Sequence, residues 1–174
     1  MKAAPDDPNI AAVRALLHYE SWRPASDLFV RAAELNPEDM ELRRNQALGL
    51  QSEGDGPAAM ALLERELRVQ PFWVEGHRTL ARIRLTRAEQ GEHDRSFAEA
   101  CATSGAPLAL HLAWFHNAAI ARDWDKVHAI LENAEHAFPG QPALRAARFY
   151  CAAETGDDES AEAALPGLAS MNDP

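Results

Sequence analysis

Cysteine is nearly absent from this chain, and its scarcity excludes one class of protein. Cys101 and Cys151 are the two cysteines among 174 residues. Small secreted proteins held together by disulfides need more than this, and both residues lie in alanine-rich segments with helical spacing. We interpret them as small buried apolar side chains in a reducing compartment, which predicts a cytoplasmic protein without a disulfide framework.

A long apolar run is also missing. The longest, Leu108 to Ala121, is too short to cross a bilayer and is interrupted by His111, His116 and Asn117, so we expect a buried helix there. Lys2 is not followed by the apolar segment of a secretory signal. We therefore expect no membrane association.

Residues that favour strands are few, and so are positive charges. Val, Ile, Thr and Tyr are sparse, and no run alternates over the length of a strand. Apolar residues make up 47% of the chain and are largely alanine and leucine, which favours packed helices. The formal net charge is −10, and an acidic surface repels phosphate backbones. We expect no nucleic-acid partner.

Motifs that carry chemistry are missing as well. The seven histidines form no His-Glu-x-x-His motif, and His111 and His116 point about 140° apart on a helix. The glycines form neither a dinucleotide-binding motif nor a phosphate loop. We therefore predict no catalytic residue, no metal site and no cofactor, and we interpret the histidines as surface or groove residues.

What the chain does have is a repeat of about 34 residues. Pro37, Pro71, Pro107 and Pro139 follow one another at intervals of 34, 36 and 32 residues, each closing a helical stretch, with a short turn midway. This period is typical of an array of paired helices, which is usually a binding surface. We expect a repeat domain over residues 9–165, between an N-terminal extension (1–8) and a tail (166–174). Its repeats are 9–37, 38–71, 72–107, 108–139 and 140–165.

Each repeat consists of a helix A, a turn and a helix B. The expected helices are residues 9–20, 24–35, 37–53, 57–69, 72–88, 92–104, 107–122, 124–137, 141–155 and 158–165. We expect helix A of the third repeat to be about three residues longer than the others. Small residues recur where helices cross, and bulky ones follow one turn later in helix B. The small residues are Ala47, Ala81, Ala118, Ala25, Ala59 and Ala161, and the bulky ones are Phe29, Leu63 and Leu131.

This pattern resembles the tetratricopeptide repeat family over about residues 9–165. The segment Met40 to Pro71 is the most similar, with matching residues at Ala47, Leu50, Gly54, Asp55, Ala59, Leu63 and Pro71. The family's tryptophan near the start of helix A is replaced by Arg43, His77, His111 and Arg145, so the repeats are divergent. The resemblance implies an all-α, right-handed superhelical solenoid of about five antiparallel helix pairs. It also implies that A helices line a concave groove that binds peptides or protein partners.

In that geometry, the groove is lined by helix A positions that face away from helix B. Arg78 and Arg82 of the third repeat lie one turn apart on one face, with Arg84 and Arg87 nearby. Guanidinium groups suit carboxylates, so a basic stripe predicts a partner with an acidic segment. The alternative is a solvated face on which these arginines pair with acids such as Glu41 and Glu75. The candidate partner-binding residues are Arg44, Arg78, Arg82, Leu85, Leu112, His116 and Tyr150.

Four aromatic residues are interpreted as packing residues. Trp22 and Trp124 occupy turn positions that we take as equivalent, just before helix B, and we expect both to pack between consecutive repeats. Trp114 and Phe115 fall at core positions of the fourth helix A.

The main functional prediction is a protein–protein interaction module that is not itself an enzyme. One alternative is the N-terminal repeat region of a larger enzyme (a sulfotransferase, a glycosyltransferase or an iron- and 2-oxoglutarate-dependent oxygenase), where the repeats position a substrate or dimerise. The other is a structural self-association domain, which predicts a homodimer.

An array needs polar ends, and the last expected helix presents Ala161, Ala163, Ala164 and Leu165. We therefore expect a chain that continues in a longer protein or pairs with itself.

Overall fold

The computed structural model describes residues 7–87 and 93–162, and no strand occurs among them. Their helices are α1 (Pro8–Glu20), α2 (Ser26–Leu35), α3 (Met40–Ser52), α4 (Gly56–Val69), α5 (Val74–Thr86), α6 (Arg95–Cys101), α7 (Leu108–Ile120), α8 (Trp124–Ala137) and α9 (Pro142–Thr155). A further helical stretch begins at residue 158 and reaches residue 162, where the described residues end. The all-α prediction is confirmed.

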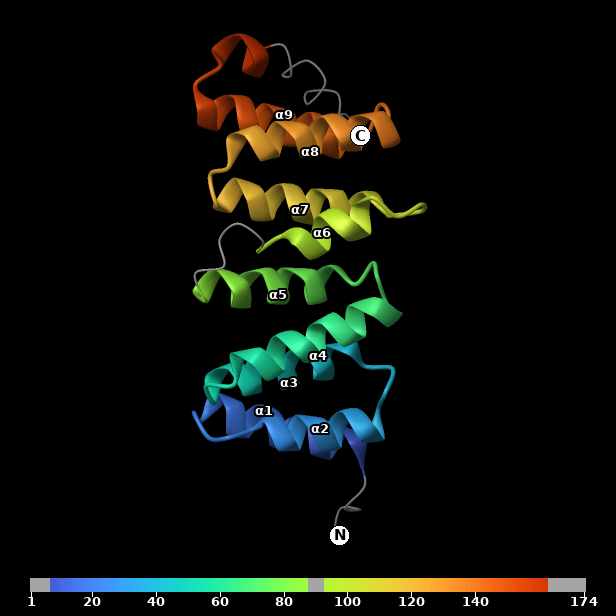
Figure 1. The fold of residues 1–174 in the computed structure, drawn as a ribbon, viewed down its shortest axis with the longest axis vertical. Helices are drawn as coiled ribbons and strands as arrows, with labels where there is room; N and C mark the ends of the chain where they lie inside the picture. The colour runs from blue at the N-terminus through green and yellow to red at the C-terminus, as the bar shows by residue number, and fades with distance from the viewer. Residues whose placement is uncertain (1–6, 88–92, 163–174) are drawn as a thin grey trace, which may run out of the picture. The chain divides into compact units, whose positions relative to one another are not determined.

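The chain divides into two compact units, Met1–His93 and Asp94–Pro174. In the first unit, α1 packs on α2, α2 on α3, α3 on α4 and α4 on α5, and the A helices α3 and α5 also touch (Figure 1). In the second unit, α6, α7, α8 and α9 pack in the same consecutive way, and α7 touches α9. Contacts between neighbours in sequence are the hallmark of repeat architectures.

The negative charge is unequally shared between the two units. Residues 1–93 carry 12 Lys and Arg against 15 Asp and Glu, a net charge of −3. Residues 94–174 carry 5 against 12, a net charge of −7. The first unit is therefore the one better able to attract an acidic partner.

Aspartates start several of these helices. Asp7 accepts hydrogen bonds from the backbone of Asn9 and Ile10, and Asp55 and Asp123 do the same for α4 and α8. A side-chain oxygen at this position satisfies a backbone N–H that has no partner within the helix. The expected start of the second helix A at residue 37 is wrong, because Asp39 caps α3 and the helix begins at Met40.

The N-terminus of α2 is capped from another repeat. Its own cap position is Ala25, which has no side-chain acceptor. The carboxylate of Glu53, just after α3, accepts from the backbone N–H of Ala25 (2.8 Å) and Ser26 (2.9 Å) and from Ser26 Oγ (2.6 Å). Gly49 permits this approach, since a Cβ there would lie 3.2 Å from the Ser26 nitrogen.

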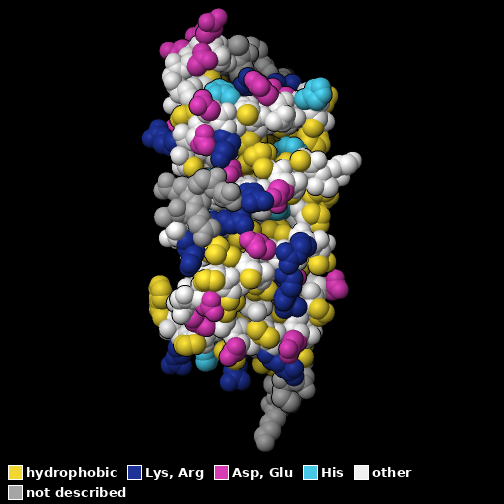
Figure 2. All heavy atoms as spheres, viewed as in Figure 1, with side chains coloured by type: hydrophobic (Ala, Val, Ile, Leu, Met, Phe, Trp, Pro, Cys, Tyr) yellow, Lys and Arg dark blue, Asp and Glu magenta, His cyan; other side chains and the backbone are white. Residues whose placement is uncertain are grey.

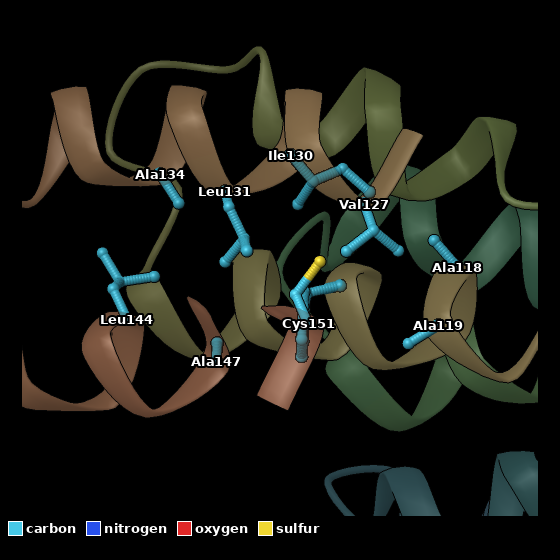
Figure 3. Close-up of a cluster of buried hydrophobic side chains, with 10 residues drawn as sticks. Ala118, Ala119, Val127, Ile130, Leu131, Ala134, Leu144, Ala147 and Cys151 are labelled. Atoms are coloured by element: carbon cyan, nitrogen blue, oxygen red, sulfur yellow. The ribbon is translucent and has the colours of Figure 1, made fainter. Parts of the chain in front are cut away.

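Each group of packed helices has a core of small and large apolar residues. One cluster lies in α1–α3 around Phe29, and a second lies in α3–α5 around Leu63. Figure 3 shows the cluster of the second unit, where Val127, Ile130 and Leu131 of α8 meet residues of α7 and α9. The expected small and bulky core residues are confirmed as buried, except Ala161, which is half-buried.

Three sequence-based expectations, two about helix length and one about packing, are wrong. Helix α5 has 13 residues, as α1, α3 and α7 do, so the third helix A is not longer. The irregular element is α6, which has 7 residues where 92–104 was expected. Trp22 is 94% exposed and is therefore not packed between repeats, whereas Trp124 packs against the core of the second unit as expected.

Trp22 adopts a strained, left-handed backbone conformation that is usually found at glycine. Gly54 (φ 90°) and Gly156 (φ 74°) follow α3 and α9 in the left-handed conformation that glycine adopts without strain. Trp22 (φ 56°) and Arg122 (φ 57°) take the same place after α1 and α7. The structural equivalent of Trp22 is therefore Arg122, two residues before Trp124.

None of the helices in the described ranges is long and apolar enough to cross a membrane. Of the expected apolar end, Ala163, Ala164 and Leu165 lie outside the described residues.

Candidate functional site

The four predicted residues of the first unit lie on the A helices α3 and α5, and we call their surface the α3/α5 face (Arg44, Arg78, Arg82 and Leu85). Arg78 and Arg82 are exposed, whereas Arg44 and Leu85 are half-buried. A hydrogen bond of 3.0 Å from Gln51 Nε2 to Thr86 Oγ1 joins the two helices at one end of this face.

Acids on the same helices pair with two of the arginines. Arg44 donates to Glu41 (Nε to Oε1, 2.8 Å), and this hydrogen bond raises the pKa of Arg44 against the effect of burial, as do the nearby charges of Glu41, Glu75 and Tyr19. Arg78 Nη1 lies 2.7 Å from Glu75 Oε1, and both side chains are nearly half exposed. An exposed pair of this kind contributes at most about 1 kcal/mol, so water or a partner's carboxylate replaces it at little cost.

The other arginines of α5 divide by the side of the helix they occupy. Arg82 is exposed and forms no ion pair with any residue in the described ranges. Arg84 is turned towards α4, where its guanidinium lies 2.7 Å from Glu64 and is 14% exposed. A Cβ at Gly56 would lie 2.7 Å from Nη1 of Arg87, so Arg87 also packs against α4. The outward-facing part of the predicted stripe is therefore Arg78 and Arg82.

The three predicted residues of the second unit lie on α7 and α9, and we call their surface the α7/α9 face (Leu112, His116 and Tyr150). Leu112 is half-buried against the core, His116 is exposed, and Tyr150 is 45% exposed. The buried Phe115 contacts two of them, with ring centroids 5.3 Å from His116 and 6.2 Å from Tyr150 at an interplanar angle of 79°. The structure thus brings both His116 and Tyr150 next to one core ring.

A buried ionic cluster in the second unit was missed by sequence reasoning. Asp94, which is 5% exposed, accepts a hydrogen bond from Trp114 Nε1 (2.7 Å) and lies 3.2 Å from Lys126 Nζ. Burial lowers the pKa of Lys126, but the charges of Asp94 and Asp123 outweigh it, so the pKa lies above its ordinary value. The three side chains tie the start of α6 to α7 and α8, which is a structural role.

The histidines are only partly at the surface. His77, His93 and His111 are buried, at 2%, 4% and 7% exposure, so their assignment to the surface or groove is wrong. Burial lowers the pKa values of His77 and His111, which keeps both rings neutral at pH 7. His77 Nε2 lies 2.8 Å from the carbonyl oxygen of Pro71, a link between helix A and the turn before it.

The short α6 leaves a hollow of about 740 Å³ in the second unit. Its lining comes from α6, the segment 102–107, α7 and the C-terminal part of α8, and the described lining residues include His111, Trp114 and Phe138 but no charged residue. Cys101 is half-buried at its wall, and burial raises the pKa of this thiol to about 12. The thiol is therefore protonated at neutral pH and is a poor nucleophile or metal ligand.

Two exposed apolar features were also missed. Ile10 (45%), Val13 (55%), Leu16 (37%) and Leu17 (58%) are exposed on α1, and Trp22 follows them. The helical spacing of the α1 residues was visible in the sequence, but their side chains could equally have faced the core.

Among residues 7–87 and 93–162, no group of three or more His, Cys, Asp and Glu side chains is placed to hold a metal ion. The two thiols, Cys101 and Cys151, are not joined to each other. Arginine pairs and apolar hollows dominate the surfaces described above, and charged and apolar groups of these kinds are common in protein interfaces.

The fold is an array of paired helices similar to that of solved structures of the tetratricopeptide repeat type. MamA RS-1, solved as the ArsTM double mutant, is similar to this chain with a TM-score of 0.52 and 11% identity, over 97% of this chain and 95% of that one. PilF of Pseudomonas aeruginosa has a TM-score of 0.52 and 12% identity, over 97% of this chain and 78% of that one. MamA AMB-1 has a TM-score of 0.50 and 12% identity, over 95% and 91%.

MamA and PilF are tetratricopeptide repeat proteins, so the similarity shows that this chain has a tetratricopeptide-repeat-like fold. No protein-family model and no curated protein matches the sequence. The low identities agree with the departures from the family pattern, at Arg43, His77, His111 and Arg145.

Proposed function

We propose that this protein is a protein–protein interaction module and that its α3/α5 face binds an acidic segment of a peptide or protein partner. The observation that carries the proposal is Arg82, an exposed guanidinium with no acidic partner among the described residues, one turn from Arg78. The guanidinium of Arg82 can bind a carboxylate of a partner molecule.

The neighbouring residues complete a mixed surface. Arg78 can exchange Glu75 for a partner's carboxylate because their pair is exposed and weak. Arg44, held by Glu41, and the half-buried Leu85 add a fixed charge and apolar contact. A surface of this composition suits an extended or helical peptide with acidic and apolar residues in alternation.

The α7/α9 face, considered by itself, suits an apolar part of a partner. Tyr150 presents an amphipathic ring supported by Phe115, and rigid aromatic residues of this kind carry much of the binding energy of interfaces. Truncating such a residue typically weakens binding by about 1–2 kcal/mol or more.

The proposal includes no catalytic step and no cofactor, and it keeps the cytoplasmic assignment. Two unlinked cysteines suit a reducing compartment and support that assignment.

The test is binding of a fluorescein-labelled ten-residue peptide of alternating glutamate and leucine, followed by fluorescence anisotropy. Arg78→Ala with Arg82→Ala should weaken binding about 10-fold and flatten its salt dependence, since two rim charges are worth roughly 0.7 kcal/mol each. Arg65→Ala with Arg68→Ala is the matched control, because both arginines are exposed on α4. Equal effects of the two double variants, or no binding to the wild type, would overturn the proposal.

A further inference from the structure

Helix α1 is apolar on two opposite faces, although the fold uses only one. Ala11, Ala12, Ala15 and Tyr19 pack into the core with Phe29 of α2. On the outer side, Ile10, Val13 and Leu17 follow the i, i+3, i+7 spacing of a single helical stripe. Four of the eight large apolar side chains that are exposed in the described residues belong to this helix.

The outer stripe borders a shallow hollow of about 490 Å³. We call this surface the α1 face and define it by the lining residues, which are Asn9, Ile10, Val13, Arg14, Leu17 and His18. Leaving these aliphatic side chains in water contributes nothing to folding, whereas covering them with a partner removes apolar surface from water. Contiguous exposed apolar surface of this kind marks interaction sites.

The edge of the α1 face is basic. Arg14 and His18 lie one turn apart along it, and none of the described residues that line the hollow is acidic. Arg14 is exposed and forms no ion pair within the described part of the chain. Figure 2 shows Lys and Arg side chains, with Asp and Glu side chains among them, along the lower edge of the first unit, over α1 and α2.

The basic edge of the α1 face favours one of two ligands, which are a second copy of this chain and an acidic amphipathic helix. If α1 paired antiparallel with α1 of a second copy about a two-fold axis, the edge of each helix that carries Arg14 would face the same edge of the other, since antiparallel helices related in this way juxtapose like edges. Like charges that face each other across two packed helices are destabilising. An amphipathic helix with acidic residues along one edge of its apolar stripe has no such conflict.

We propose that the α1 face is a second partner-binding surface, separate from the α3/α5 face, and that its ligand is an acidic amphipathic helix. The apolar stripe of the ligand covers Ile10, Val13 and Leu17, and its carboxylates reach Arg14. The recognition is that of a helix on an apolar surface, with anchors spaced at i, i+3 and i+7.

The probe is a 16-residue helical peptide with leucine at positions spaced i, i+3, i+7 and i+10 and glutamate beside them, added to the full chain and followed by NMR amide shifts and anisotropy. We expect shifts in α1 and saturable binding. Val13→Ser should weaken binding at least 5-fold, by loss of buried apolar area. Val69→Ser, an equally apolar change at a 75% exposed site on α4, should leave it unchanged.

The charge contribution is tested separately. Arg14→Glu should weaken the glutamate peptide about 10-fold and strengthen a peptide with lysine at the same positions. Failure of the charge reversal to change the preference, or equal loss from Val13→Ser and Val69→Ser, would refute the proposal. A dimer in light scattering that Val13→Ser dissociates would refute it in favour of a second copy. The variant with Arg78→Ala and Arg82→Ala must still bind the probe, which separates this surface from the α3/α5 face.

Discussion

Replacing Glu53 by alanine tests how one repeat stabilises the preceding one. The side chain reaches from the end of α3 to the first residues of α2, which has no capping side chain of its own. Removing it leaves the N–H groups of Ala25 and Ser26 and the Ser26 hydroxyl without this acceptor. The expected result is a loss of stability confined to the first unit.

The size of the effect follows from the three hydrogen bonds, which measure 2.6–2.9 Å. Loss of a helix cap costs about 0.5–2 kcal/mol, and hydrogen bonds to a charged group are worth about 1.5–3 kcal/mol each when buried. Glu53 itself is exposed, and water partly replaces it. We therefore expect about 2 kcal/mol from Glu53→Ala and less from Glu53→Gln, which keeps a neutral acceptor.

The effect also depends on pH. Burial raises the pKa of Glu53, but the hydrogen bonds from Ser26 and Ala25 outweigh it, so the folded pKa lies below its ordinary value of 4.5. The unfolded chain therefore takes up the proton first as pH falls. The contribution of Glu53 is fully present above about pH 5 and is lost as pH falls through the folded pKa.

The assay is urea unfolding followed by circular dichroism at pH 7 and at pH 3. Wild type and Glu53→Ala should differ by about 2 kcal/mol at pH 7 and by less at pH 3. Glu38→Ala, an exposed acid between α2 and α3, should change stability by less than about 0.5 kcal/mol. A difference between wild type and Glu53→Ala that is no larger than this control, or one that is unchanged at pH 3, would refute the reasoning.

Four further predictions address single features. Asp94→Ala should cost about 2 kcal/mol, because it leaves the Trp114 indole N–H without its acceptor and removes one of the two carboxylates that pair with the half-buried Lys126, whereas the exposed Asp125→Ala should be near neutral in the same urea titration. Gly49→Ala should lower the thermal midpoint despite the gain in helix propensity, since the new methyl meets fixed backbone; a higher midpoint would contradict this. Cys101 should react with a thiol reagent at pH 8 far more slowly than it does in urea, and equal rates would contradict its raised pKa. Trp22→Gly should stabilise the chain by about 0.5–1 kcal/mol by relieving a left-handed backbone, and a loss of stability would show that the side chain packs.

The sequence predicted the core well because the repeat period fixes which residues lie at helix crossings. Ala47, Ala59 and Leu63 were selected by their spacing alone, and all three are fully buried. The helix pairs follow from the same spacing, since a period of about 34 residues leaves room for little else.

The register of the turns could not be predicted from the position of tryptophan. Trp22 and Trp124 look equivalent because both precede a helix B, yet the left-handed residue of the turn is Trp22 in one case and Arg122 in the other. An error of two residues moves a side chain from the core to water. A left-handed backbone conformation defines this position of the turn, and in a sequence it can be recognised only where the residue is glycine.

The length of α6 also depended on tertiary contacts. The alanine-rich segment around Ala98, Ala100 and Ala102 has helical composition over the whole expected range. The helix instead begins after Asp94, whose carboxylate is taken by α7 and α8 and does not cap α6, and it ends at Cys101. These partners lie 20 and 32 residues further along the chain, beyond the reach of local pattern.

For the candidate residues, helical period identified Arg78 and Arg82 as a pair on one exposed face. Arg84 lies about 200° from Arg82 around the helix and therefore pairs with α4. The competing acids, Glu41 and Glu75, were visible, but their pairing depends on rotamers that the sequence does not specify. The α1 face was missed because both sides of that helix are apolar.

The neighbour-to-neighbour packing of the first unit gives its amide protons an uneven resistance to exchange with solvent. Helix α1 rests mainly on α2, whereas α3 is held by α2, α4 and α5. The end of the unit can therefore open at a smaller free energy than its middle, and fraying of α1 need not disturb α4 or α5. A ligand held on α1 would slow deuterium uptake most at that end, so occupancy could be followed as a local change in exchange rate along the chain.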